Sequence, residues 1–236
     1  MNDISELLVP LRRAVYPLCF DTGNEYFPVN TFGTCFLVEL KCGFFAVTLK
    51  HVIMDVHVSD LFIFEESDLI EPIRFKKRAF FECTNSPDSQ IADLALLEVN
   101  LDTMSKPAPA YNLSKISNEW ENEPHNYHYR VFGYPSIERD VDDSKKHIET
   151  VQHCLNGVYI GKSMLVDCYK IKINNIITTN PLNMDGFSGS PVFAWHNDAE
   201  SIFDTALCGI AIQAKGDTLN FLRRWEIDEA ARYICS

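Results

Sequence analysis

The sequence has little positive charge and no strong cluster of it. Its 236 residues include 21 Lys and Arg against 33 Asp and Glu, which gives a net charge of -12. Contact with nucleic-acid phosphates needs grouped Lys and Arg side chains. The longest basic stretch here is the triplet Lys76-Lys77-Arg78. We therefore expect no nucleic-acid partner.

Long apolar runs are also missing. No stretch approaches the length of a membrane-spanning helix, and segment 1–6 is acidic, without the basic start of a secretory signal. We therefore expect no membrane partner and a cytoplasmic location.

Metal-ligand spacings are absent as well. The chain has seven His and eight Cys, but no Cys-x-x-Cys pair and no His-Glu-x-x-His motif, so we expect no metal and no other cofactor. Several cysteines lie in apolar strand-like segments, where a reduced thiol behaves as a small buried hydrophobe. These are Cys19, Cys35, Cys168 and Cys208. Reduced cysteines fit the expected cytoplasmic location.

Short β-branched and aromatic segments dominate the chain. A length of 236 residues with 46% hydrophobic composition suits one large all-β domain or two small barrels. Segments 33–40 and 44–48, joined by the turn at 41–43, predict a hairpin. The charged segment 138–149 predicts an exposed loop, and the apolar spacing over 220–234 predicts an amphipathic helix.

The segment Asp-Gly-Phe-Ser-Gly-Ser-Pro at 185–191 predicts a nucleophile. A serine between glycines, at a bend before an apolar strand, can present its hydroxyl without obstruction. The amides of Gly186 and Ser188 can then converge on one point, as an oxyanion hole requires. The alternative interpretation is an ordinary Gly/Ser turn that leads into a buried strand.

A serine hydroxyl needs a histidine base and a carboxylate that orients the base. His51 closes the apolar segment that ends in Thr48-Leu49-Lys50, and Asp93 stands directly before the apolar run 94–99. Asp88 is the alternative acid, but its neighbours are typical of an exposed turn. The predicted catalytic set is His51, Asp93 and Ser188.

These three motifs, Thr-x-x-His, Asp-Leu-Ala-Leu-Leu and Gly-x-Ser-Gly-Ser-Pro, resemble those of the trypsin-like serine peptidases in their order along the chain. The resemblance extends from about residue 13 to the C-terminus. It implies an all-β, chymotrypsin-like fold of two six-stranded antiparallel β-barrels with a C-terminal helix. Residues 1–110 would form the barrel that carries His51 and Asp93, and residues 111–236 the barrel that carries Ser188. It also implies a serine endopeptidase that cleaves protein or peptide substrates through an acyl-enzyme.

The residue before the serine bears on regulation. Zymogen-type trypsins carry Asp there, which pairs with an N-terminus released by cleavage, whereas this chain has Phe187. The chain thus resembles the bacterial and HtrA-like branch, which implies competence without N-terminal processing. Gating by a regulatory protein partner or a ligand, in a signalling or defence system, stays open. The alternative function is a catalytically silent module that binds proteins.

The resemblance also implies which residues select the substrate. Leu182 stands six residues before Ser188, where trypsin has the Asp that selects Arg or Lys. The segment 209–214 resembles the substrate-binding strand of the family and offers Ile212, Gln213 and Ala214. An apolar pocket leaves a charged substrate side chain without a partner. We therefore expect apolar or small residues before the scissile bond, with Asp185 or Asp217 as alternative pocket bases.

Overall fold

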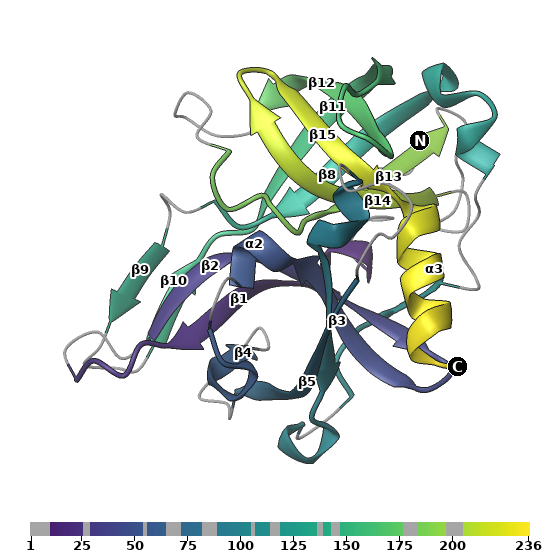
Figure 1. Ribbon diagram of the computed structural model, residues 1–236. Coiled ribbons are helices and arrows are strands. Elements are labelled where there is room, and N and C mark those ends of the chain that lie inside the picture. The colour runs from purple at the N-terminus through teal and green to yellow at the C-terminus, as the bar shows by residue number, and fades with distance from the viewer. Residues whose placement is uncertain are drawn as a thin grey trace.

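Two β-barrels make up most of the protein. The computed structural model describes residues 10–25, 29–53, 56–64, 72–81, 89–104, 107–113, 119–135, 139–142, 147–176, 184–196 and 205–236. Both barrels are closed, six-stranded and antiparallel, and a helix follows them at the C-terminus (Figure 1). The all-β, chymotrypsin-like fold class expected from the sequence is confirmed.

The first barrel contains the strands from the N-terminal half. They are β1 (Val15–Asp21), β2 (Val29–Leu40), β3 (Gly43–Leu49), β4 (Leu61–Ile63), β5 (Ile73–Phe80) and β6 (Leu94–Val99). They run around the barrel in the order β1-β4-β5-β6-β3-β2, and pairing of β2 with β1 closes it. The hairpin expected at 33–48 is β2 and β3, joined by a turn at 41–42. A short strand, β7 (Tyr111–Asn112), pairs in parallel with β2.

The second barrel follows the order β11-β12-β15-β14-β13-β8. Its strands are β8 (Tyr127–Gly133), β11 (His153–Lys162), β12 (Cys168–Ile176), β13 (Pro191–His196), β14 (Thr205–Lys215) and β15 (Thr218–Arg223). The expectation of a loop over 138–149 is wrong in part, because β9 (Arg139–Asp142) and β10 (His147–Thr150) pair there as a hairpin. Main-chain pairing of short segments does not require an apolar pattern, which is why charge alone misled the prediction.

The helices lie at the ends of strands. Helix α2 (Lys50–Ile53) follows β3, and α3 (Arg224–Ile234) follows β15. Short 3-10 turns include η1 (Val58–Asp60), η2 (Gln90–Asp93), η3 (Leu101–Thr103), η5 (Glu119–Glu121) and η6 (Pro124–Asn126). The helix expected to start at residue 220 starts later, because Phe221 and Leu222 pair with β12 and β14 to close the barrel.

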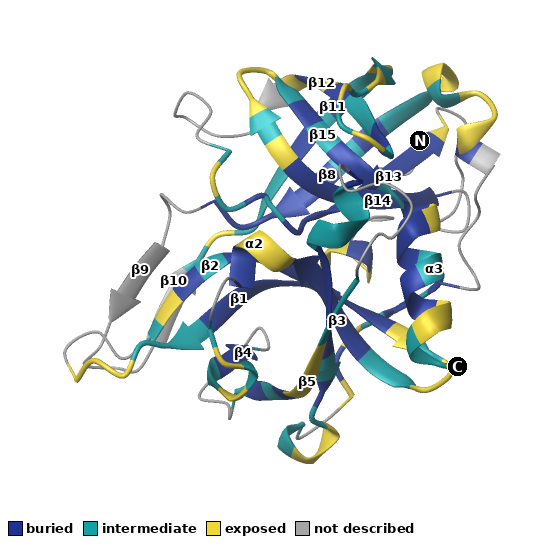
Figure 2. Ribbon diagram, viewed as in Figure 1, coloured by how far each residue is buried: buried dark blue, intermediate teal, exposed yellow. Residues whose placement is uncertain are grey.

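Buried residues lie along the strands of both barrels and where the barrels meet (Figure 2). One core cluster joins residues of the two barrels, since Phe36 and Leu37 of β2 belong to the same cluster as Phe193 of β13. The barrels are therefore packed against each other over apolar surface. The division of the chain after residue 110 stays a prediction.

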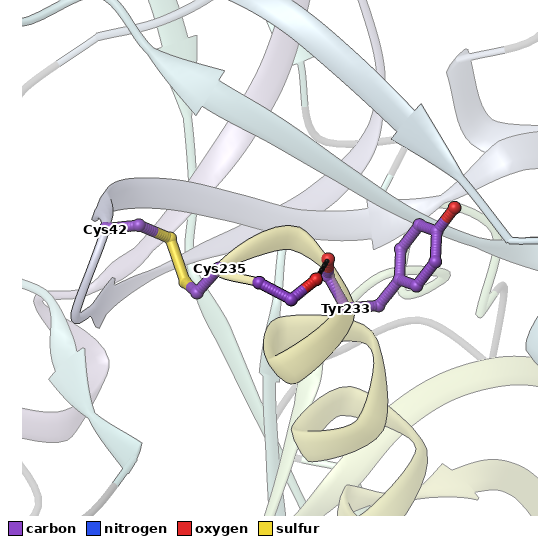
Figure 3. Close-up of a disulfide and its surroundings, with 4 residues drawn as sticks. Cys42, Tyr233 and Cys235 are labelled. Carbon is purple, nitrogen blue, oxygen red and sulfur yellow. Dashed lines mark hydrogen bonds between the residues drawn. A yellow bond between two sulfur atoms is a disulfide. The ribbon is translucent and has the colours of Figure 1, made fainter.

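A disulfide joins the first barrel to the residue that follows α3. Cys42, in the turn between β2 and β3, is bonded to Cys235, directly after α3, over a sequence separation of 193 (Figure 3). The expectation that the cysteines are reduced is wrong for this pair. It is confirmed for the four strand cysteines named above, all of which are free and buried. Sequence spacing could not identify the pair, because its two members meet only through the packing of α3 beside the first barrel.

Candidate active site

A cleft of about 620 Å³ brings together the residues that the sequence analysis singled out. Its lining comes from the first barrel and α2, from the loop before β13, and from the end of β14. The lining residues are Phe32, His51, Val52, Met184, Asp185, Gly186, Ser188, Ile212, Gln213, Ala214 and Gly216. The cleft is therefore built from both barrels.

Asp93 holds His51 through two hydrogen bonds. The His51 backbone N–H donates to Asp93 Oδ1 at 2.9 Å, and His51 Nδ1 lies 2.5 Å from Asp93 Oδ2. A carboxylate can only accept, so Nδ1 carries the proton and Nε2 keeps its lone pair. The His51 side chain is 49% exposed, so a substrate can reach Nε2. This is the arrangement that a general base requires.

Local structure explains how Asp93 reaches His51. Asp93 is the last residue of the 3-10 turn η2, whose first turn is capped by the Ser89 side chain accepting from the Ile91 N–H. The strand β6 starts at the next residue and pairs with β3, which leads directly into α2 and His51. The neighbouring strands therefore bring the two side chains together although 42 residues separate them.

Ser188 lies in a tight loop directly before β13. Gly186 and Gly189 flank it, with positive φ angles of 96° and 89°. The Phe187 N–H donates to Met184 O at 3.1 Å and the Ser190 N–H to Phe187 O at 2.9 Å, which closes two successive turns. Glycine is needed at both flanking positions because side chains disfavour these backbone conformations.

Two amides of this loop stay available as donors. Among the described residues, none accepts a hydrogen bond from the Gly186 or Ser188 N–H. Both residues line the cleft. Paired backbone donors without an internal acceptor are what an oxyanion hole needs.

The Ser188 hydroxyl donates to the Ile212 carbonyl on β14 at 3.0 Å. Ile212 stands at a register shift between Ala211 and Gln213 and has no Cα partner on β15. Its carbonyl can therefore accept a hydrogen bond from the Ser188 loop. Transfer of the Ser188 proton to His51 requires rotation of the hydroxyl away from this acceptor.

The residues expected to select the substrate are only partly brought together. Ile212, Gln213 and Ala214 line the cleft, and so does Asp185. Asp217 is not among the lining residues and lies 3.5 Å from Lys172 Nζ. Leu182 lies outside the described residues.

Other histidines contact neighbouring side chains. His57 caps the 3-10 turn η1, with Nδ1 2.8 Å from Ser59 Oγ. Further histidines contact aromatic rings: His125 edge-on to Tyr159, His196 edge-on to Tyr127, and His128 tilted against Trp195. The alternative acid Asp88 lies outside the described residues. Asp93 contacts His51 directly.

Sequence reasoning missed two residues at the site. Phe32 lines the cleft and stacks on Phe20 with ring centroids 3.8 Å apart. Thr34 is fully buried on β2, and its hydroxyl donates a hydrogen bond to the Gly186 carbonyl in the loop that carries Ser188. A buried polar residue inside an apolar segment was the available signal for Thr34, since such a side chain needs partners.

The free thiols are poor alternatives to Ser188 as a nucleophile. Burial raises the pKa of Cys35 and Cys208 well above the usual range, and it raises the pKa of Cys168 to about 12. A thiol that stays protonated at neutral pH is unreactive. Within the described ranges, no group of three His, Cys, Asp or Glu side chains could hold a metal ion.

No protein-family model matches the chain, and no curated protein matches it significantly in sequence. The two barrels are compatible with a chymotrypsin-like module. In the part of the chain that the structure describes, no helix is long and apolar enough to cross a membrane.

Proposed function

We propose that this protein is a serine endopeptidase. Ser188 attacks a peptide carbonyl, and His51 Nε2 takes the hydroxyl proton and later returns it to the leaving amine. Asp93 fixes the tautomer of the imidazole, and the Gly186 and Ser188 amides stabilise the oxyanion. Water then hydrolyses the acyl-enzyme. The substrate is a protein or peptide, and no cofactor takes part.

One observation carries this proposal. A histidine held at Nδ1 by a carboxylate shares a cleft with a serine whose flanking amides are available as donors. A Gly/Ser turn that is only structural gives no reason for such a histidine to lie in the same cleft. Phe187 is buried and its loop is closed by internal hydrogen bonds, which supports competence without N-terminal cleavage, as in the HtrA-like branch.

A fluorophosphonate probe tests the proposal directly. Wild-type protein should become labelled on Ser188, and Ser188→Ala should abolish the labelling. Ser190→Ala is the matched control, because the buried Ser190 Oγ has no hydrogen-bond partner in the structure as described and should be dispensable. A wild type that stays unlabelled both alone and after addition of cell extract, or a Ser188→Ala variant that labels equally, would refute the peptidase proposal.

The orientation of the Ser188 hydroxyl favours a second candidate, a silent module that binds proteins. In the structure this hydroxyl donates to Ile212 O and not to His51. A regulatory partner or ligand that rotates the hydroxyl would convert this state into the active one. Purified protein that binds unfolded polypeptide but labels only after addition of cell extract would support gating, and binding without labelling under either condition would support the silent module.

The specificity proposal follows from the cleft. The lining residues of β14 are apolar or uncharged, which supports apolar or small residues before the scissile bond. Asp185 is the acid of the cleft that could reverse this preference. A cleavage profile dominated by Arg or Lys, and lost in Asp185→Asn, would contradict the proposal and assign Asp185 as the pocket base.

Cytoplasmic location is the remaining part of the proposal. The Cys42–Cys235 disulfide argues against it, because disulfides persist mainly in oxidising compartments. Alkylation of thiols at the moment of cell lysis, followed by mass spectrometry, gives the state of both cysteines. Free thiols at both positions are expected in the cytoplasm, and a quantitative disulfide would contradict this location.

A further inference from the structure

Thr34 connects the first barrel to the loop that carries the proposed nucleophile. Its side chain is fully buried. Thr34 Oγ1 donates to the Gly186 carbonyl at 2.8 Å and accepts from the Tyr134 N–H at 3.0 Å. Its backbone N–H donates to the Ser188 carbonyl at 3.1 Å. One residue of β2 therefore fixes two carbonyl groups of a loop that belongs to the other barrel.

These two carbonyls belong to the residues whose amides are the proposed oxyanion donors. Gly186 has no side chain to restrict its backbone, so an external contact is needed to hold the orientation of its peptide groups. The hydrogen bond from Thr34 Oγ1 holds the peptide group that follows the Gly186 amide, and the bond from the Thr34 N–H holds the one that follows the Ser188 amide. Both bonds start from a fully buried residue, so their donors stay in place while the loop faces the cleft.

The backbones also touch beside this contact. A Cβ atom built on Gly189 would lie 1.9 Å from the Thr34 carbonyl oxygen. Thr48 Oγ1 donates to the same oxygen at 3.1 Å, which fixes Thr34 within its own barrel. A displacement of Thr34 is therefore transmitted to the Ser188 loop.

We infer that Thr34 is a positioning residue for the oxyanion hole. Its hydroxyl holds the peptide group that follows the Gly186 amide and so fixes the place of Gly186 in the loop, which aligns the donors of the second barrel only when the first barrel is docked. This inference rests on the proposed peptidase function, because only that function gives the two amides a reaction to serve. Thr34 touches no reacting atom and acts through Gly186 and Ser188.

Thr34→Val tests the inference because it removes the hydroxyl at nearly constant shape. The donors assist the transition state more than bound substrate, so kcat should fall about 100-fold while KM changes little. Thr34→Ser restores the hydroxyl and should recover most of kcat. If the valine variant does not fold, Thr34→Ala, which adds no bulk, should show the same loss.

The chain offers a matched control in Thr103. Its hydroxyl accepts from the Arg74 N–H at 3.1 Å and donates to the Asn100 carbonyl at 2.7 Å, which are the same two kinds of bond, away from the cleft. Thr103→Val should keep wild-type kcat even if it lowers the melting temperature. An equal loss of kcat in Thr103→Val would show a general effect of lost stability and would overturn the inference.

A second measurement does not depend on activity. Heteronuclear NOE values of the Gly186 and Ser188 amides should fall in Thr34→Val and return in Thr34→Ser. If wild type is inert but these amides respond as expected, the peptidase proposal fails, and what stands is that Thr34 orders the two amides. If neither kcat nor the amides respond to Thr34→Val, the inference is wrong, whether or not the wild type cleaves peptides.

Discussion

At the scale of single residues, the contact between Asp93 and His51 makes the most specific prediction. An Asn side chain at 93 can donate to Nδ1 and so favours the tautomer that leaves the proton on Nε2, where it cannot act as a base. Asp93→Asn should lower the rate of fluorophosphonate labelling by about 10⁴-fold while leaving the fold intact. The measurement is the labelling rate under pseudo-first-order conditions.

Asp88→Asn is the control for this prediction, since Asp88 is the other acid that the sequence offered. It should label at the wild-type rate. The reverse result, with the loss in Asp88→Asn and none in Asp93→Asn, would assign the orienting role to Asp88.

Alanine variants of two glycines with positive φ distinguish the cost of backbone strain from the cost of a steric clash. Gly23 has a φ of 71° with open space around it, whereas a Cβ at Gly189 would meet the Thr34 carbonyl oxygen at 1.9 Å. Gly23→Ala should cost about 1–2 kcal/mol of unfolding free energy, from backbone strain alone. Gly189→Ala should cost clearly more and abolish labelling, because the strand and the loop must move apart. Urea denaturation of both variants measures the difference, and equal costs would contradict the close approach.

At the scale of elements, a buried carboxyl of α3 leads to a prediction about how the unfolding free energy depends on pH. Burial raises the pKa of Glu226 above its ordinary value of 4.5, and the contact with Arg223 at 3.0 Å offsets this only in part. A carboxyl with a raised folded-state pKa stabilises the fold most below pH 4.5, and this contribution is lost as pH rises through the folded-state pKa. Glu226→Gln should therefore lose less unfolding free energy than wild type between pH 4.5 and neutral pH.

Asp228 provides an independent check on the same helix. Burial is also the main cause that raises its pKa, against the attraction of Arg224. Asp228→Asn should change the pH dependence in the same direction, as measured by urea denaturation at both pH values. A pH dependence unchanged from wild type in both variants would contradict the prediction.

Elements with a strong local pattern could be predicted from the sequence. The β2–β3 hairpin joins two segments rich in β-branched and aromatic residues by a turn, and His51 follows it on the short helix α2. The start of α3 could not be predicted, because Phe221 and Leu222 fit a helical spacing equally well until their pairing with β12 and β14 is known. Tertiary pairing overrides local propensity there.

The same distinction holds within the candidate site. The motifs around His51, Asp93 and Ser188 are short and contiguous, so the sequence alone identified them. The Thr34 contact joins residues 152 positions apart, and no local pattern marks such a pair. The direction of the Ser188 hydroxyl was likewise beyond the sequence, since it depends on a register shift in β14.

At the scale of the whole molecule, the disulfide and α3 connect the two barrels. The helix leaves the second barrel after β15, and the bond from Cys235 to Cys42 joins its end to the first barrel (Figures 1 and 3). A covalent link across a separation of 193 residues restricts the unfolded chain strongly. In the chain-entropy model such a bond contributes about 3–5 kcal/mol.

Cys42→Ser should therefore lower the unfolding free energy of the oxidised protein by about 3–5 kcal/mol. Reduction of the wild type with dithiothreitol should produce a similar loss, and the Cys42→Ser variant should no longer respond to the reductant. Cys154→Ser is the control, because Cys154 is free and half-buried, and its variant should keep the full response. Thermal melts with and without reductant measure all three proteins. The disulfide lies outside the cleft lining. Ser188 labelling at temperatures well below the melting temperature should therefore be the same before and after reduction. A loss of labelling on reduction would show that the disulfide also holds the barrels in their active arrangement.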